Sequence, residues 1–370
     1  MNRLGRRGFM TSGAAASVLG FADSLFSSRC SVKANAWASG DTVQLMSDGL
    51  NLAPLEYSRL LLKLAEEKRI EADYYSLGGS VKELERKFAQ VLGKESAVFM
   101  PTGTLANHLA IRTLANGKSR VILQSESHVY NDSGDCIQTL SNLNLIPLAS
   151  NKATFALQEV EEVLARTATG RVATPVGVIS IESPVRRKTG EMFDYDEMKR
   201  ISSFARKNNI RLHLDGARLF LASAYTGIAP AAYAALFDTV YVSLWKYFNA
   251  ASGAILAGPK SIMENMFHTR RMFGSGLPAA WTYAAVATNY LDGFTDRFKE
   301  AIKTSEDLME RLKGHPNFRI ERIPAGTNVF RLRVQGAEAD AYVKTLKVKG
   351  VLVSPPMNDS NVLVLHVNET

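Results

Sequence analysis

The alternation of strand-like and helical segments between residues 96 and 258 constrains the fold most strongly. Short apolar runs such as "SAVFM" (96–100) and "RVILQ" (120–124) alternate with amphipathic stretches such as "DEMKRISSFARKN" (196–208). This alternation predicts an open, mostly parallel α/β sheet with helices on both faces. In such a sheet ligands bind beyond the carboxyl ends of the strands, so the residues that follow each strand are the first to consider for chemistry.

The pattern changes in the C-terminal third of the chain. It becomes mainly helical after residue 260, and then the strand-like "TNVFRLRV" (327–334) and "NVLVLHV" (361–367) flank one more helical stretch. We therefore predict a large domain over residues 43–275, followed by a helical linker and a small α+β domain over residues 276–370. A chain of 370 residues with 46% hydrophobic content can bury a core of that size.

The N-terminus has the pattern of an export signal. Arg6 and Arg7 precede a mildly apolar run rich in Ala, Gly and Ser, and "ANA" (34–36) offers a cleavage site. These features predict a twin-arginine signal peptide over residues 1–36 and a periplasmic or secreted bacterial protein. The alternatives are an ordinary secretory signal or an uncleaved anchor. The apolar run is short and polar for a membrane span, so we expect no stable membrane insertion after cleavage.

Charge and cysteine content favour neither a nucleic-acid partner nor a metal. Residues 1–36 hold five basic residues and one acid, so their removal lowers the formal net charge from +8 to +4. The remaining mixed surface does not favour nucleic-acid binding. With only Cys30 and Cys136 the chain has no disulfide framework or thiolate metal site, and its histidines lack paired metal-ligand spacing.

One lysine stands out in the stretch "VYVSLWKYFNAASGAIL" (240–256). Lys246 comes at the end of a strand-like apolar run, where loss of hydration lowers the pKa of the amine. A neutral amine is what a lysine needs to form a Schiff base. The alternative is a lysine that leaves the sheet and directs its ammonium group to solvent.

Three other strand ends carry residues suited to chemistry. The turn from Pro101 to Gly103, with a helix opening at Thr104, could hold a phosphate on backbone N–H groups and hydroxyls. Asp215 ends "IRLHLD" and could pair with a pyridinium nitrogen, while His128 could stack on a cofactor ring. The alternatives are helix caps at the turn and at Asp215 and a structural histidine.

These motifs, in this order, resemble those of the low-specificity threonine aldolase and β-eliminating lyase family. The resemblance is carried by the following segments: "MSDG" (46–49), "DYYSLGGSVKELE" (73–85), "VFMPTGTLANHLA" (98–110), "ESHVY" (126–130), "HLDGARLF" (213–220), "SLWKYF" (243–248) and "TNVFRLR" (327–333). It runs from about Val43 to the C-terminus. It implies fold type I, pyridoxal 5′-phosphate as cofactor, and a homodimer or homotetramer.

The resemblance also implies cofactor-binding roles for five residues. Lys246 holds the cofactor as a Schiff base, and Asp215 pairs with its ring nitrogen. Gly103 and Thr104 bind its phosphate. His128 stacks on the ring and takes part in proton transfer.

Four residues are expected around the amino-acid substrate. The resemblance implies that Ser47 and Arg218 receive the substrate carboxylate and that Tyr75 lies at the mouth of the site. Arg187 is a further candidate for the carboxylate. The segment "RRMFGSGL" (270–277), with Arg270 and Arg271, is expected to be lent across a subunit interface.

The chain departs from the family pattern at three places. Trp245, Tyr247 and Phe248 replace small residues around the lysine, which predicts a narrower site. The segment "ESPVRRKTG" (182–190) lacks the family's Thr-His pair and gains two arginines. The arginine that the small domain usually offers to the substrate has no match in "NVLVLHVNET" (361–370).

The predicted activity is a retro-aldol cleavage of a β-hydroxy-α-amino acid, similar to threonine, into glycine and an aldehyde. One alternative is a β-eliminating lyase or aminotransferase that acts on another amino acid. A second is a pyridoxal-phosphate-binding protein whose catalytic site has drifted.

Overall fold

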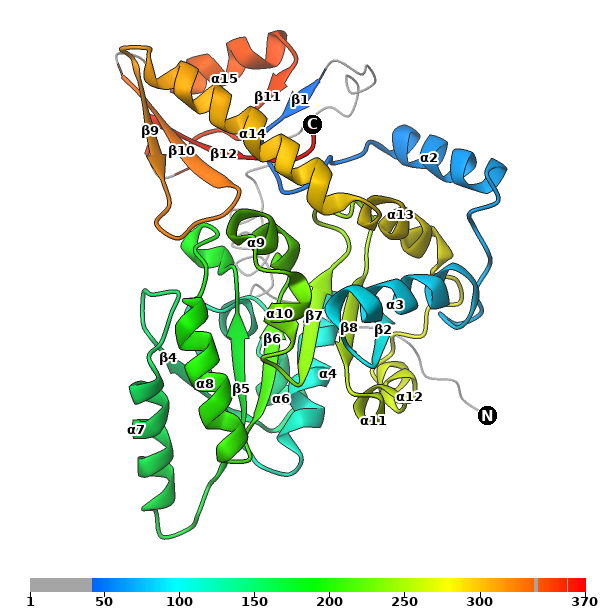
Figure 1. Cartoon of the computed structure of the whole chain (residues 1–370), viewed down its shortest axis with the longest axis vertical. Helices are drawn as coiled ribbons and strands as arrows, with labels where there is room; N and C mark the ends of the chain where they lie inside the picture. The colour runs from blue at the N-terminus through cyan, green and yellow to red at the C-terminus, as the bar shows by residue number, and fades with distance from the viewer. Residues whose placement is uncertain (1–41, 336–338, 358) are drawn as a thin grey trace, which may run out of the picture. The chain divides into compact units, whose positions relative to one another are not determined.

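A seven-stranded sheet organises the larger part of the chain (Figure 1). The computed structural model describes residues 42–335, 339–357 and 359–370, so the predicted signal peptide lies outside the described residues. In the spatial order of the sheet the strands are β2 (Ser96–Met100), β8 (Ala254–Gly258), β7 (Thr239–Ser243), β6 (Arg211–Asp215), β5 (Val176–Glu182), β3 (Arg120–Gln124) and β4 (Asn144–Leu148). Only β8 runs antiparallel to its neighbours, which confirms the mostly parallel sheet.

Helices cover both faces of this sheet because successive strand residues point to opposite sides. In β3, Val121 and Leu123 belong to a core cluster that they share with Ile111 and Leu114, whereas Ile122 belongs to a second cluster. The helices between the strands are α4 (Gly103–Ala115), α5 (His128–Asn131), α6 (Cys136–Ser141), α7 (Leu157–Ala168), α8 (Tyr195–Lys207), α9 (Leu219–Thr226) and α10 (Pro230–Ala234).

Helix α8 shows how sequence sets these elements. Asp194 caps its first turn by accepting a hydrogen bond of 2.7 Å from the backbone N–H of Glu197. Acidic residues in the first turn and basic residues in the last complement the helix dipole. Met198 and Ile201 lie on the buried face and pack into the main core. The amphipathic pattern therefore predicts both the helix and its packed face.

A smaller antiparallel sheet forms in the C-terminal part. Strand β10 (Val329–Val334) pairs with β9 (Phe318–Arg322) on one side and with β12 (Val362–His366) on the other. Helices α14 (Phe294–Lys313) and α15 (Ala339–Val348) contribute residues to the same apolar cluster as this sheet. The structure thus confirms an α+β arrangement here. The described residues form one compact unit, so the domain boundary at residue 275 stays a prediction.

The N-terminal end of the described chain pairs with the C-terminal part before it continues into the helices of the larger part. Strand β1 (Val43–Gln44) pairs in parallel with β11 (Val351–Leu352). The remaining helices are α2 (Pro54–Glu66), α3 (Gly79–Leu92), α11 (Lys260–Met263), α12 (Met266–Met272) and α13 (Trp281–Leu291), with a short 3-10 turn at Arg186–Lys188. None of the described helices is long and apolar enough to span a membrane.

The prediction that Tyr247 and Phe248 narrow the site is wrong. Both side chains are fully buried and belong to the main core, where their rings contact Phe220 and Phe294 at centroid distances of 5.1 to 6.3 Å. The chain turns as it leaves β7, and this turn directs the two rings into the core. Of the three bulky replacements only Trp245 is exposed.

Candidate active site

The carboxyl ends of the parallel strands bring the predicted residues to one edge of the sheet. Asp215 ends β6, where it lies opposite Glu182, the last residue of β5, and opposite Tyr241 of β7. Lys246 follows the end of β7 at Ser243. The structure therefore places Lys246 and Asp215 at the same edge, as the strand pattern predicts.

A buried chain of hydrogen bonds orients Asp215. Its Oδ2 atom accepts a hydrogen bond of 2.7 Å from Asn107 Nδ2, and Asn107 Oδ1 in turn accepts one of 2.8 Å from His213 Nε2. His213 Nδ1 then lies 2.9 Å from the hydroxyl of Thr239. Burial lowers the pKa of His213 to about 4, so its ring is neutral and donates through one nitrogen only.

Sequence reasoning missed Asn107. Its signal is a polar residue that falls one turn after Gly103, within the buried run Ala106–Ile111 of α4. A buried amide of this kind needs partners for its oxygen and its nitrogen. In this protein the two partners are His213 and Asp215.

The amine of Lys246 has the property that its position predicts. Burial, and next the charge of Arg218, lower the pKa of Lys246 to about 8. The Nζ atom lies 4.7 Å from the centroid of the exposed Trp245 ring. Behind the lysine, a Cβ atom on Gly49 would lie 2.1 Å from the carbonyl oxygen of Lys246, so only glycine lets the segment 46–49 pack there.

The turn before α4 has the donors of an anion site. Thr102 caps the helix by accepting a hydrogen bond of 3.2 Å from the N–H of Leu105. A Cβ atom on Gly103 would lie 2.0 Å from the hydroxyl of Tyr241, so the turn can approach β7 only as glycine. At the end of β7, Ser243 Oγ is buried and has no hydrogen-bond partner among the described residues. A phosphate that accepted hydrogen bonds from this hydroxyl and the helix N-terminus would satisfy both.

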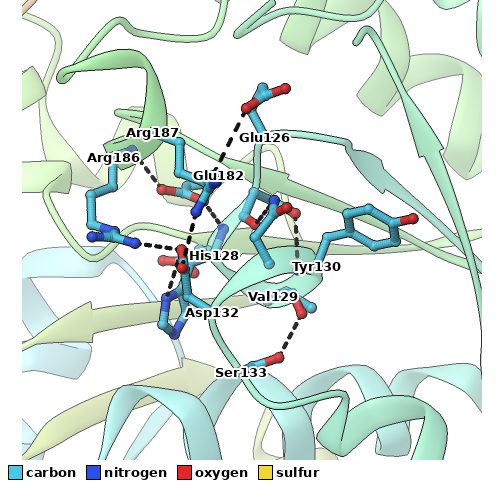
Figure 2. Close-up of polar contacts among 12 residues, drawn as sticks. Glu126, His128, Val129, Tyr130, Asp132, Ser133, Glu182, Arg186 and Arg187 are labelled. Atoms are coloured by element: carbon cyan, nitrogen blue, oxygen red, sulfur yellow. Dashed lines mark hydrogen bonds and ion pairs between the residues drawn. The ribbon is translucent and has the colours of Figure 1, made fainter. Parts of the chain in front are cut away.

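His128 begins α5 and is fixed through Glu182 (Figure 2). One oxygen of Glu182 accepts a hydrogen bond of 2.5 Å from the backbone N–H of His128, and the other accepts one of 2.8 Å from the N–H of Arg186. Burial, and next the charge of Asp215, raise the pKa of Glu182. Sequence reasoning missed this residue, although an acid at the end of the fully buried strand "VGVISIE" was a usable signal.

Arg187 belongs to a cluster of ion pairs beside His128. Asp132 accepts hydrogen bonds of 2.5 Å from Arg186 Nη2 and 3.2 Å from Arg187 Nη1, and Arg187 Nε lies 3.9 Å from Glu126 (Figure 2). His128 Nδ1 lies 4.0 Å from the same aspartate. Arg187 therefore has two acidic partners within its own chain, and its role in binding a substrate carboxylate stays a prediction.

Arg218 also has an internal partner. Its Nε atom donates a hydrogen bond of 2.8 Å to Asp48, which accepts a second one of 3.0 Å from Asn328. Burial opposes ionisation of Asp48, but the charge of Arg218 and the hydrogen bonds hold the pKa of this carboxyl below its usual range. Ser47 is adjacent in sequence and donates a hydrogen bond of 3.0 Å to the carbonyl oxygen of Gly49.

Tyr75 and the segment 270–277 meet one another. The guanidinium of Arg271 lies 4.7 Å from the centroid of the Tyr75 ring, and the N–H of Tyr75 donates a hydrogen bond of 3.0 Å to Pro278. The place of Tyr75 at the mouth of the site stays a prediction. That the segment 270–277 is lent to a neighbouring subunit also stays a prediction, although the Arg270 side chain is buried within its own chain and donates to the carbonyl oxygen of Phe99.

Across residues 42–335, 339–357 and 359–370, no three His, Cys, Asp or Glu side chains are grouped so that they could hold a metal ion.

Comparison with known proteins identifies the family. The model of the beta-eliminating lyase family matches residues 65–335 of the chain. The protein belongs to this family. Members of the beta-eliminating lyase family depend on pyridoxal phosphate, and the seven-stranded sheet with its small C-terminal domain is the fold type I architecture of such enzymes. The resemblance and the fold class that the sequence predicts are thereby confirmed.

Individual relatives within the beta-eliminating lyase family carry different names. The chain is 31% identical to a low-specificity L-threonine aldolase of Candida albicans, over 56% of each protein. It is 32% identical to alanine racemase TOXG of Cochliobolus carbonum, over 56% of this chain and 53% of that protein. The chain thus matches about half the length of these two relatives. The crystal structure of a putative L-allo-threonine aldolase from Listeria monocytogenes is 26% identical with a TM-score of 0.73, covering 89% of this chain and 90% of that one.

Proposed function

We propose that the protein is a pyridoxal-phosphate-dependent lyase that cleaves a β-hydroxy-α-amino acid into glycine and an aldehyde. The observation that carries the proposal is that Lys246, a lysine of lowered pKa, and the buried Asp215 lie at the same edge of the sheet. The relatives named as threonine aldolases support this reaction.

The residues present suit the cofactor. Lys246 would hold it covalently, Asp215 would pair with its ring nitrogen, and His128 would cover its ring. The N-terminus of α4, with Thr104, and the unpaired hydroxyl of Ser243 would take its phosphate. When bound, this cofactor supplies an electron sink for a bond broken at Cα of an amino acid.

The protein's own part in the reaction is to orient groups and to move protons. Asn107 holds Asp215 in one rotamer, because Asn107 Oδ1 is itself fixed by His213. His128 is the base that we assign to the substrate β-hydroxyl. When that hydroxyl loses its proton, the Cα–Cβ bond breaks, the aldehyde carbonyl forms, and Cα takes up a proton to give glycine.

Product analysis tests the proposal. A panel of amino acids should give glycine and an aldehyde from β-hydroxy substrates. Keto acid and ammonia would instead indicate a β-eliminating activity, for which the family name is the supporting observation. Loss of the optical rotation of L-alanine, with Cα losing and regaining a proton and no aldehyde, keto acid or ammonia released, would indicate a racemase, for which the name of one relative is the supporting observation. A yellow protein without turnover would indicate a site that has drifted.

We further propose that the protein works as a homodimer or homotetramer. Tyr74, Leu77, Trp245 and Met272 are large apolar side chains that lie exposed, and Tyr74 packs edge-on against Tyr75 at 4.8 Å. Such exposed side chains are typical of an interface between copies. Export through Arg6 and Arg7 also stays a proposal. Loss of export in the Arg6→Lys, Arg7→Lys double variant would support it.

A further inference from the structure

A cavity of about 600 Å³ lies between the 186–190 loop and the C-terminal sheet. Its lining includes Arg186 and Thr189 from the loop, Arg331 and Arg333 from β10, His366 from β12, and Arg218. Arg218 comes three residues after Asp215, and its charge is one cause of the lowered pKa of Lys246. The cavity therefore opens beside the residues assigned to the cofactor.

The register of the sheet explains why arginines line this cavity. Arg331 and Arg333 alternate along β10 with the buried Phe330 and Leu332, so they occupy the face away from the apolar cluster. Across the ladder Arg331 pairs with Val364 and Arg333 pairs with Val362. The β12 segment is where the family's small-domain arginine finds no match in the sequence. The positive charge of this face thus comes from the neighbouring strand.

Most of the lining charges are already paired. The two acids of the lining, Glu321 and Asp359, both accept from Arg333 at 2.8 Å. Arg186 pairs with Asp132, and Arg218 pairs with Asp48.

Arg331 differs from the other three arginines. Its side chain forms no hydrogen bond or ion pair with any residue that the structure describes, although it lines the cavity. A guanidinium is suited to bind a carboxylate with two parallel hydrogen bonds. A cavity with one such uncommitted cation next to the reacting centre suits a substrate with a second acidic group.

We propose that this cavity receives the substrate side chain and that Arg331 binds a carboxylate on it. The preferred substrates are then β-hydroxy-α-amino dicarboxylates. The inference rests on the proposed lyase function. The reaction is the same cleavage as in the proposed lyase function. The β-hydroxyl loses its proton, the Cα–Cβ bond breaks, and Cα gains a proton. The products are glycine and an aldehyde that keeps the second carboxylate.

The test compares acidic substrates with neutral ones of the same shape. We expect kcat/KM for β-hydroxyaspartate or β-hydroxyglutamate to exceed that for β-hydroxyasparagine or β-hydroxyglutamine by roughly tenfold, since Arg331 is itself exposed to solvent. Arg331→Gln should abolish this preference, because kcat/KM should fall more for the acidic substrates than for the neutral ones. The matched control is Arg319→Gln, because Arg319 is an exposed arginine of the same sheet that does not line the cavity. This control should keep the preference.

A second measurement needs no bond cleavage. Aspartate and asparagine lack the β-hydroxyl, and their binding can be titrated through the absorbance of the cofactor in the holoenzyme. Aspartate should bind the parent more tightly than asparagine, and Arg331→Gln should remove the difference. Equal affinities in the parent, or equal losses in the Arg331 and Arg319 variants, overturn the inference. If no β-hydroxy amino acid yields an aldehyde, the proposed lyase function fails, and this titration still decides the role of Arg331.

Discussion

The Nε atom of Arg218 lies 2.8 Å from Asp48, a residue 170 positions earlier in the chain, and neither side chain is more than 14% exposed. Asn328 and His366 approach the same aspartate at 3.0 and 3.5 Å. One carboxylate therefore joins the segment before α2, the edge of the large sheet, and two strand ends of the small sheet.

Removal of Arg218 should be strongly destabilising. The Arg218→Ala change leaves the buried charge of Asp48 without its main partner, for which we expect a loss of about 3 to 5 kcal/mol in the free energy of unfolding. Urea unfolding measures it. The control is Arg211→Ala at the start of β6, since Arg211 pairs with Asp238 at 2.9 Å but is 56% exposed, and its loss should cost less than about 1 kcal/mol. Equal losses in the two variants would contradict the buried-pair argument.

The reactivity of Lys246 should follow its lowered pKa. Only the neutral amine attacks an aldehyde, and its fraction reaches one half near pH 8 and levels off at higher pH. The rate at which the cofactor-free protein captures pyridoxal phosphate should therefore rise to half its maximum near pH 8. Borohydride should fix the cofactor on Lys246, and Lys246→Ala should stay colourless while Lys260→Ala stays yellow. A reduced adduct on another lysine would show that the assignment is wrong.

The substitution Asn107→Leu should weaken both folding and cofactor binding. It leaves buried groups of Asp215 and His213 without a partner, which costs about 1 to 3 kcal/mol for each unsatisfied group. Urea unfolding and the absorbance of the bound cofactor report the two effects. Asn208→Ala removes only an exposed amide contact at the end of α8, and its effect should stay within about 0.5 kcal/mol.

Glu85 should make stability depend on pH. Burial raises the pKa of Glu85 to about 7, while its carboxylate accepts a hydrogen bond of 2.8 Å from Phe99. Because the folded state holds this proton more tightly than the unfolded chain, stability falls as pH rises from about 4.5 to about 7. Glu85→Gln cannot ionise. Its free energy of unfolding relative to the parent should therefore increase across that window, by up to about 3 kcal/mol. A constant difference from pH 4.5 to pH 8 would contradict the shift.

Light scattering should show a dimer or tetramer. Leu77→Asp and Met272→Asp place charges on the exposed apolar side chains near Tyr75 and Arg271, so both should weaken association. Val348→Asp is the control, because Val348 is also exposed but lies in α15. An active, cofactor-loaded monomer would rule the assembly out.

The sequence predicts the elements of this fold well because their signals are local. Apolar runs such as 96–100 and 120–124 are strands, and the amphipathic stretch at 196–208 is a helix. The residues at strand ends meet at one edge because parallel strands share that edge, so Lys246 and Asp215 could be placed without a structure.

The pairing of side chains could not be predicted in the same way. Nothing near Asp48 indicates that Arg218 is its partner, and nothing near Arg187 indicates Asp132. These pairs form between segments that are distant in sequence, and their partners depend on the final packing. The orientation of the Tyr247 side chain could not be predicted for the same reason, because it depends on how the chain turns after β7.

The position of β2 has a consequence for the order in which the protein matures during synthesis. This strand emerges early from the ribosome, but among the described strands it pairs with β8 alone, so Met100 can pair with Ala254 only after residue 254 has been synthesised. The turn at 101–104 follows β2 directly and cannot reach its final place until β8 has been translated. By then Lys246 is already synthesised. The pocket for the cofactor can therefore be completed only after β8 has been made, and we expect a nascent chain that is interrupted before residue 258 to be unable to retain pyridoxal phosphate.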